Sequence, residues 1–128
     1  MKMRINLSGL SLLTLFFLSV LFGCKDNDTR SFMPGTYVNH AEGTYAVADD
    51  TLVVEHAENN NYLIHRRTGF NRIENGKKGN REYETEEWNA VYDQKLKTLR
   101  ETRRGKILTF YPKAGKLKVG NREYIKLK

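Results

Sequence analysis

The sequence predicts an all-β domain behind an N-terminal targeting segment: a small antiparallel up-and-down β-barrel or a bent meander of about eight strands. From residue 34 to residue 128, short segments rich in β-branched and aromatic residues alternate with turn residues. Nearly all connections have hairpin lengths, and helical periodicity is weak. A two-sheet sandwich is the alternative that these patterns leave open.

The first 23 residues form the targeting segment. Lys2 and Arg4 give it a positive head, and residues 7–22 follow without a charge. As a helix this apolar run would extend about 24 Å, which is short of the roughly 30 Å hydrocarbon core of a membrane. The pattern is typical of a secretory signal peptide over residues 1–23, and an uncleaved membrane anchor is the alternative.

The apolar run ends in Leu21-Phe22-Gly23-Cys24, which resembles the lipobox of bacterial lipoproteins. The resemblance implies that the signal is cut before Cys24, that the thiol receives diacylglycerol, and that the new amine receives a further chain such as palmitate. Phe22 departs from the pattern, because a small or β-branched residue is commoner there. A lipid on Cys24 explains why the chain has a single cysteine, and it makes the membrane a partner through this anchor.

The next residues, Lys25-Asp26-Asn27-Asp28, resemble the acidic export signal that follows the acylated cysteine in lipoproteins of the Bacteroidota. The resemblance implies that Lys25, Asp26 and Asp28 direct the protein to the outer membrane and expose it at the cell surface. A periplasm-facing position is the alternative, since the same residues also fit a solvated linker. We therefore divide the remaining chain into an acylated tether, residues 24–33, and an all-β domain, residues 34–128.

The strands of the domain follow from its turn residues. Pro34-Gly35 precedes the first strand, Ala48-Asp49-Asp50 is expected to be a turn, and residues 75–80 are expected to form a long loop. Gly120-Asn121 suits a type II′ turn, with glycine first. The β-prone segments between the turns are residues 36–38, 44–47, 51–56, 61–67, 81–92, 97–103, 106–111, 116–119 and 122–127.

The long strand at residues 81–92 changes the phase of its apolar residues near Glu86-Glu87. A β-bulge at this point would restore one buried face. With a preceding loop centred near Lys77, the expected cross-strand neighbours are Tyr62 with Tyr92, Ile64 with Ala90, and Arg66 with Trp88. The last pair predicts a cation–π contact.

No catalytic residue, metal or cofactor is expected. After the signal peptide the only serine is Ser31, in the tether, so no rigid Ser-His-Asp or Cys-His arrangement can form. His40, His56 and His65 lie in no metal-binding motif. The acidic residues of the long strand are expected to pair with arginines across the ladder; they are Glu82, Glu84, Glu86 and Glu87.

A basic cluster is the remaining candidate for binding. The chain carries a net charge of +7, and Arg103, Arg104 and Lys106 gather at one hairpin. Together with Arg66 and Trp88 they form the candidate binding surface. No nucleic-acid-binding motif appears, so contact with anionic lipid head groups or glycan is the functional alternative to a solvated strand face, and no nucleic acid partner is expected.

The chain as a whole is similar to small Bacteroidota lipoproteins, some of which accompany mobile or conjugative elements. The similarity rests on the lipobox and on the segments at residues 34–40 and 65–70. It implies a non-enzymatic accessory lipoprotein that docks on an envelope protein, as in a transport or conjugation assembly. The alternatives are a lipocalin-like binder of a small apolar ligand and an inhibitor of an envelope hydrolase. The first rests on Gly35-Thr36-Tyr37, which resembles the Gly-x-aromatic start of the first strand in lipocalin-type domains.

Overall fold

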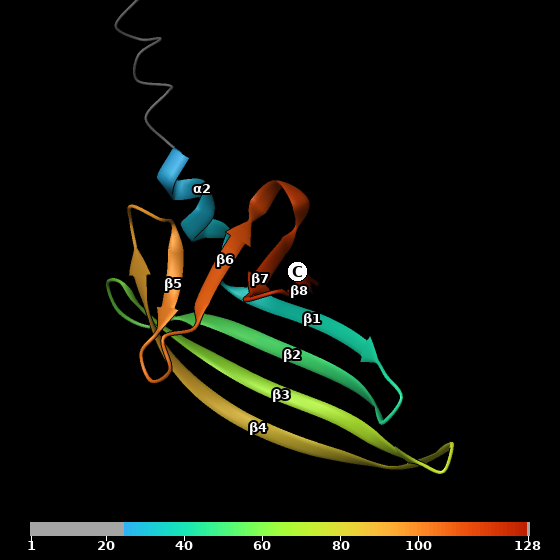
Figure 1. The fold of residues 1–128 in the computed structure, drawn as a ribbon. Coiled ribbons are helices and arrows are strands. Elements are labelled where there is room, and N and C mark those ends of the chain that lie inside the picture. Colours follow the sequence, from blue (N-terminus) through green and yellow to red (C-terminus); the bar gives the residue numbers. More distant parts are fainter. Residues whose placement is uncertain (1–24, 128) are drawn as a thin grey trace, which may run out of the picture.

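The computed structural model describes residues 25–127 and shows a closed antiparallel β-barrel whose eight strands follow one another around the barrel in chain order (Figure 1). The predicted all-β up-and-down architecture is therefore confirmed, and the sandwich alternative is wrong. The elements are α2 (Lys25–Phe32), β1 (Gly35–Glu42), β2 (Ala46–His56), β3 (Asn61–Glu74), β4 (Lys77–Asp93), β5 (Thr98–Glu101), β6 (Ile107–Tyr111), the short 3₁₀ helix η1 (Pro112–Ala114), β7 (Lys116–Val119) and β8 (Arg122–Lys126).

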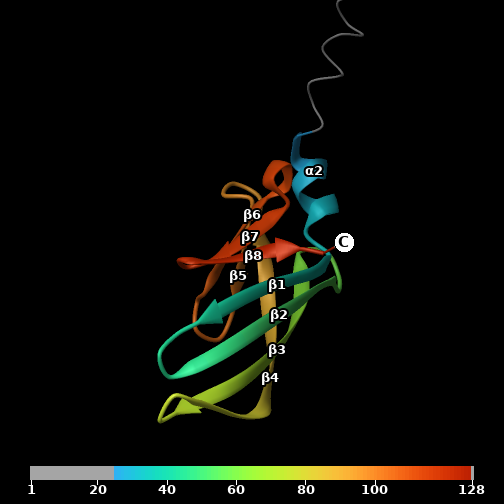
Figure 2. The same ribbon diagram turned by 90° about the vertical axis from the view of Figure 1, so that its right-hand side faces the viewer.

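The barrel is closed at one end and open at the other. β1 and β8 meet through two residue pairs, and the 17-residue strand β4 pairs with β5 only along its last four residues. The outer parts of β2, β3 and β4 therefore project beyond the closed end, as Figures 1 and 2 show. We call this projecting sheet, residues 46–49, 69–74 and 77–85, the wing.

The core lies in the closed end. Inward-facing side chains of all eight strands meet there, because alternate residues of a strand point to the same face. No buried hydrophobic side chain among the described residues comes from the wing. The core residues are Met33, Tyr37, Leu52, Val54, Tyr62, Ile64, Trp88, Ala90, Tyr92, Leu99, Leu108, Phe110, Leu117 and Tyr124.

Helix α2 covers the end of the barrel opposite to the wing (Figure 1). Phe32 packs edge-on against Tyr37 and Phe110 with ring centroids 5.9 and 6.3 Å apart, and Met33 is fully buried. Arg30 Nη2 donates a hydrogen bond to the Asn59 carbonyl oxygen at 2.6 Å. The C-terminal part of the expected acylated tether, residues 24–33, thus packs on the barrel, because Phe32 and Met33 provide apolar surface that the barrel end buries.

Two turn predictions were wrong. Residues 48–50 lie inside the continuous strand β2, since the Asp50 side chain finds donors within the barrel. The expected long loop at 75–80 is a two-residue turn, in which Asn75 has φ 53° and Gly76 has φ 75°. Positive φ at both central residues is the signature of a type I′ hairpin turn, for which Asn-Gly is the favoured sequence.

The register of β3 with β4 differs from the prediction by two residues. Tyr62 is paired with Ala90, Ile64 with Trp88, and Arg66 with Glu86. A shift of two leaves every side chain on its expected face. The irregularity in the ladder lies between Asn71 and Ile73 rather than at Glu86-Glu87, so the predicted position of the bulge was wrong.

Within residues 25–127, no helix is long and apolar enough to cross a membrane. The predicted signal peptide and the predicted lipid attachment residue, Cys24, lie outside the described residues.

Candidate functional site

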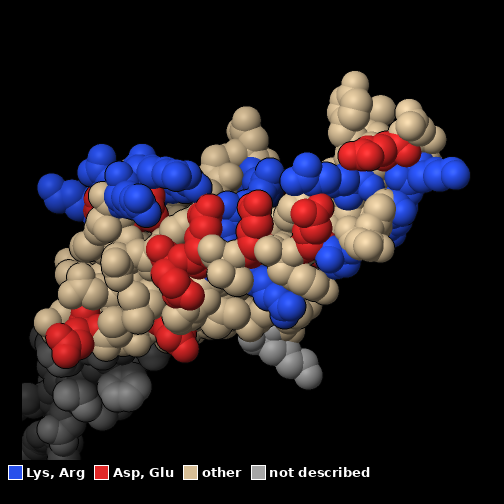
Figure 3. Space-filling model, turned by 90° about the horizontal axis from the view of Figure 1, so that it is seen from below, with Lys and Arg blue, Asp and Glu red and all other residues tan. Residues whose placement is uncertain are grey.

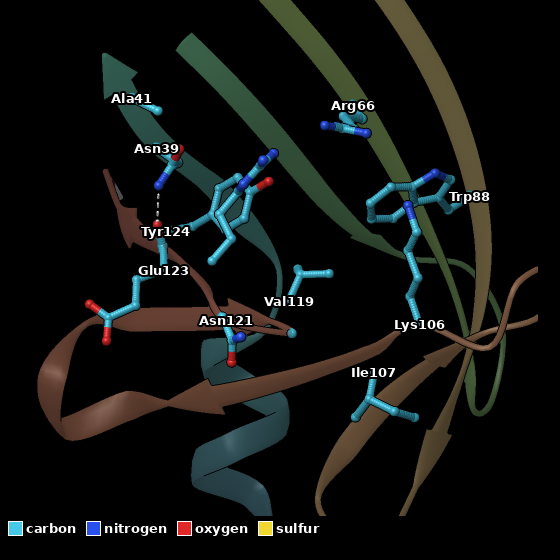
Figure 4. A pocket seen from close by; sticks show the side chains of 12 residues that line it. Asn39, Ala41, Arg66, Trp88, Lys106, Ile107, Val119, Asn121, Glu123 and Tyr124 are labelled. Carbon is cyan, nitrogen blue, oxygen red and sulfur yellow. Dashed lines mark hydrogen bonds between the residues drawn. The ribbon is translucent and has the colours of Figure 1, made fainter. Parts of the chain in front are cut away.

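A groove with a volume of about 1150 Å³ lies at the open end of the barrel, between the inner face of the long strands and the β7–β8 hairpin (Figure 4). Arg66, Trp88 and Lys106 line one wall, and Asn39, Asn121 and Tyr124 line the opposite wall. The other lining residues are Ala41, Ile107, Val119, Gly120, Arg122 and Glu123. The groove therefore combines cationic, amide and apolar surface.

Trp88 forms the centre of the first wall. The Lys106 ammonium lies 4.4 Å from the centroid of its ring, and the Arg66 guanidinium lies at 5.7 Å, so the predicted contact between Arg66 and Trp88 is present. The indole Nε1 donates a hydrogen bond to Glu86 Oε2 at 2.9 Å. This bond lowers the pKa of Glu86, which stays ionised beside the arginine.

Asp50 lies beneath both walls and connects them. Its carboxylate is 3% exposed, and it accepts hydrogen bonds from Arg66 Nε at 3.0 Å, Thr68 Oγ1 at 2.8 Å and Tyr124 Oη at 2.5 Å. Arg122 Nη1 approaches at 3.4 Å. One buried carboxylate thus holds two guanidinium groups that come from β3 and β8.

The protonation states of this network are fixed at neutral pH. Burial alone would raise the pKa of Asp50, but the hydrogen bonds from Arg66, Tyr124 and Thr68 outweigh it and lower that pKa. Burial lowers the pKa of Arg66, but the bond to Asp50 outweighs it and raises the pKa. Burial, together with the bond to Asp50, raises the pKa of Tyr124 to about 12. Tyr124 therefore stays a neutral donor while Asp50 stays an anion.

The structure brings together only part of the predicted binding surface. Arg66, Trp88 and Lys106 line the groove, whereas the side chains of Arg103 and Arg104 are exposed in the turn between β5 and β6. The backbone N–H groups of these two arginines donate to the buried carboxylate of Glu101 at 2.7 and 2.9 Å, so Glu101 fixes the backbone of the turn and leaves both arginine side chains in solvent.

The residues that sequence reasoning missed are Asp50, Arg122 and Tyr124. The sequence predicts a turn at Asp50, and the two others come from the last strand, more than 70 residues away in the chain. One local signal points to a buried polar role for Asp50. The residue directly precedes the β-prone run Thr51-Leu52-Val53-Val54, where a charged side chain is unusual.

The predicted export residues Lys25, Asp26 and Asp28 fall in helix α2, and the Asp28 side chain is exposed. On the outer face of the sheet, His40 contacts Asp49 and Glu42, and His65 contacts Glu55 and Glu87. These contacts raise the pKa of both histidines. Among the described residues there is no group of three or more potential ligands that could hold a metal ion.

A second candidate surface is the edge of β4. Residues 77–88 pair with β3 on one side, and on the other side no described strand pairs with them. We call these residues the β4 edge. Figure 3, which views the molecule from the side where β4 lies, shows acidic side chains in a row with lysines and arginines around them. Glu82, Glu84 and Glu86 share the inner face of this edge strand by alternation.

Comparisons with known proteins assign the chain to no family: no family model matches it, and neither the curated proteins nor the solved structures contain a match.

Proposed function

We propose that this chain is a non-enzymatic docking component of the bacterial cell envelope, which receives an extended segment of a partner protein along the β4 edge. The proposal rests on the open side of β4. Along residues 77–88, which contain no proline, no described strand pairs with the side of β4 that faces away from β3. Such an edge is a template for strand addition, in which backbone hydrogen bonds supply affinity and alternate side chains supply specificity.

Charge decides which partner fits. A second copy that paired antiparallel around residue 84 would place Glu82 opposite Glu86 and Glu84 opposite its own counterpart, and like charges in these positions are destabilising. A segment with lysine or arginine opposite Glu84 would meet a carboxylate that forms no salt bridge with any described residue, whereas Arg72 already pairs with Glu82 and Arg66 with Glu86. Glu84 therefore disfavours self-pairing around this position and favours a partner strand with a basic residue opposite it.

The anchoring part of the proposal rests on the sequence. The lipobox supports acylation of Cys24 and attachment to the outer membrane, and Lys25, Asp26 and Asp28 support export to the cell surface. A periplasm-facing position remains the alternative localisation. The partner is then an envelope protein, as in a transport or conjugation assembly, and no nucleic acid is involved.

The two other candidate functions have no specific observation in their favour. A lipocalin-like binder of an apolar ligand needs space inside the barrel, and here 14 buried hydrophobic residues fill the closed end. An inhibitor of lysozyme would have to approach a basic enzyme, although this chain itself carries a net charge of +7.

Site-specific photo-crosslinking in cells tests the docking surface. Tyr83 is 56% exposed on the β4 edge and Tyr111 is 39% exposed on β6, so benzoylphenylalanine can replace either one. We expect a discrete adduct from position 83 and none from position 111. Glu84→Lys should abolish the adduct, whereas Glu58→Lys, which makes the same charge change at another exposed site, should preserve it.

Equal adducts from both positions, or an adduct that Glu84→Lys leaves intact, would contradict docking along this edge. The anchor has a separate test, because Cys24→Ser should leave an uncleaved or soluble product. Unchanged processing and membrane fractionation of that variant would refute acylation of Cys24 without bearing on the β4 edge.

A further inference from the structure

The groove at the open end of the barrel contains a lysine that no described carboxylate contacts directly, although Glu86 and Glu101 lie near enough to interact with its charge. Lys106 forms no salt bridge with any described residue, and its ammonium rests on the ring of Trp88 at 4.4 Å. Arg122 has a half-exposed side chain, and its contact with Asp50 is long, at 3.4 Å. Glu123, the acidic residue in the lining, is engaged by Lys116 and Lys118 at 3.3 and 3.5 Å. The groove therefore presents positive charge to a ligand.

The arginines of the groove are held in place before any ligand arrives. Asp50 is 3% exposed and binds Arg66 and Arg122 from below, and replacing a buried ionic group by apolar residues is often neutral or stabilising. Apolar side chains could supply the same stability, so the stability that Asp50 contributes does not by itself account for these charges. Fixing two guanidinium groups on opposite walls does explain them, because a preorganised site loses less conformational entropy on binding.

Besides the cations, the lining offers two other kinds of surface. The amides of Asn39 and Asn121 supply neutral hydrogen-bonding groups, and Asn39 Nδ2 donates to the Glu123 carbonyl oxygen at 2.7 Å. Ile107 and Val119 supply apolar surface between the walls, and Ala41 supplies apolar surface on the side opposite Trp88 (Figure 4). A sugar acid has the matching set of groups, namely a carboxylate, several hydroxyl groups and a ring face rich in C–H bonds.

We propose that this groove binds an acidic oligosaccharide, a short chain of sugars that carry carboxylates. Its volume of about 1150 Å³ exceeds what a single small anion fills and suits several sugar units. Arg66, Lys106 and Arg122 bind the carboxylates, and the asparagine amides bind hydroxyl groups. The site shares Trp88 with the β4 edge, but its cations lie on β3, on β8 and in the loop before β6, so it remains if docking along that edge is refuted.

Binding moves Lys106 away from the indole. The ammonium exchanges its contact with the Trp88 ring for a charge-assisted hydrogen bond to the ligand carboxylate, and a sugar ring takes its place on the indole. Trp88 is the only tryptophan of the chain, so its fluorescence reports on this groove alone.

The test is a fluorescence titration of the full chain in detergent with tetragalacturonate. Maltotetraose is the neutral sugar control and tetraglutamate is the acidic peptide control. We expect a saturable change in Trp88 emission with tetragalacturonate only. Lys106→Gln and Arg122→Gln should each weaken binding about tenfold, as the loss of one hydrogen bond to a charged group predicts. Lys113→Gln removes a charge in η1, outside the groove, and should leave the affinity unchanged.

Each contrary result overturns the proposal. An equal response to tetraglutamate would make the groove a peptide site, and an equal response to maltotetraose would show that the cations do not select the ligand. Absence of binding to tetragalacturonate in a calorimetric titration would exclude a spectroscopically silent complex. Unaltered affinity of the Lys106 and Arg122 variants, shown to be folded by circular dichroism, would place any binding elsewhere.

Discussion

The closed end of the barrel and the wing share the strands β2, β3 and β4, yet the inner faces of these strands differ between the two regions. Along β4 the inward positions 92, 90 and 88 carry Tyr, Ala and Trp, which are buried, whereas positions 86, 84 and 82 carry Glu. The change follows the point at which β5 stops pairing with β4, at Ala90. The inward row is apolar where opposing strands enclose it and acidic where they do not.

The wing replaces packing by ion pairs and by contacts between cations and rings. Arg72 Nε lies 3.1 Å from Glu82 Oε2, and Arg81 Nη2 lies 2.7 Å from Asp49 Oδ2. The Arg67 guanidinium lies 4.3 Å from the ring centroid of Tyr83. Exposed pairs of this kind contribute about 0–1 kcal/mol each. Backbone hydrogen bonds between strands therefore stabilise the wing, whereas burial of apolar side chains stabilises the closed end of the barrel.

Truncating one aromatic residue in each region is the strongest test of whether side-chain packing stabilises the closed end more than the wing. Phe110→Ala removes a buried ring that packs against Phe32 and Tyr37, and we expect a loss of about 3–5 kcal/mol in the free energy of unfolding. Tyr83→Ala in the wing should cost less than about 1 kcal/mol. Urea denaturation followed by fluorescence measures both. Equal losses would show that the wing is packed as tightly as the barrel.

Asp50 lies at the border between the two regions. Asp50→Asn should destabilise the fold by about 2 kcal/mol at pH 7, below the usual cost of breaking a buried pair because Arg66 and Arg122 are partly solvated. The folded-state pKa of Asp50 lies below the unfolded value, so its contribution is present above about pH 4 and is lost as the pH falls through the folded pKa. The difference between wild type and variant should therefore shrink in acid, and a difference independent of pH would contradict this account.

Hydrogen exchange compares the two regions within a single strand. Amides of β4 at residues 90–93 lie between β3 and β5 and should be strongly protected. Along the β4 edge, the amides that point away from β3 should exchange as fast as those of an open loop, which gives an alternating pattern by NMR. Uniform protection along β4 would show that the edge is covered in solution.

The smallest effect concerns a histidine on the outer face. The bond to Glu55, followed by that to Glu87, raises the pKa of His65 above its ordinary value of 6.5. Its stabilising contribution is therefore present below pH 6.5 and is lost as the pH rises through the folded pKa. NMR titration should show Glu55→Gln lowering this pKa, with Glu58→Gln as the matched control. An unchanged pKa in Glu55→Gln would refute the pairing.

The closed end of the barrel could be predicted from the sequence because its signals are local. Alternation of apolar residues defined the strands, and Gly120, with φ 61°, starts the two-residue turn expected there. The wing could not be predicted in the same way. The change of pattern at Glu86-Glu87 predicts a bulge only if the strand buries one face along its whole length. Tyr83, 56% exposed, shows that this condition fails in the wing.

The groove was predictable only in part. The contact between Arg66 and Trp88 is predictable because the two residues lie on neighbouring strands. An error of two residues in the register leaves both side chains on the same face. Asp50 and Tyr124 are brought together by closure of the barrel, which depends on two residue pairs between β1 and β8. Contacts between the first and last strands have no local sequence signal.

The position of α2 has a mechanical consequence. The helix leads directly into β1 at the end opposite to the wing; β1 runs from there toward the wing, and β2 returns antiparallel beside it (Figure 1). If the N-terminus is tethered and a partner pulls on the wing, tension acts along the strands. The eight residue pairs of β1 and β2 are then loaded in shear together instead of being peeled apart one by one. A sheet oriented in this way resists extension through its longest ladders and leaves the short β7–β8 hairpin outside the line of force.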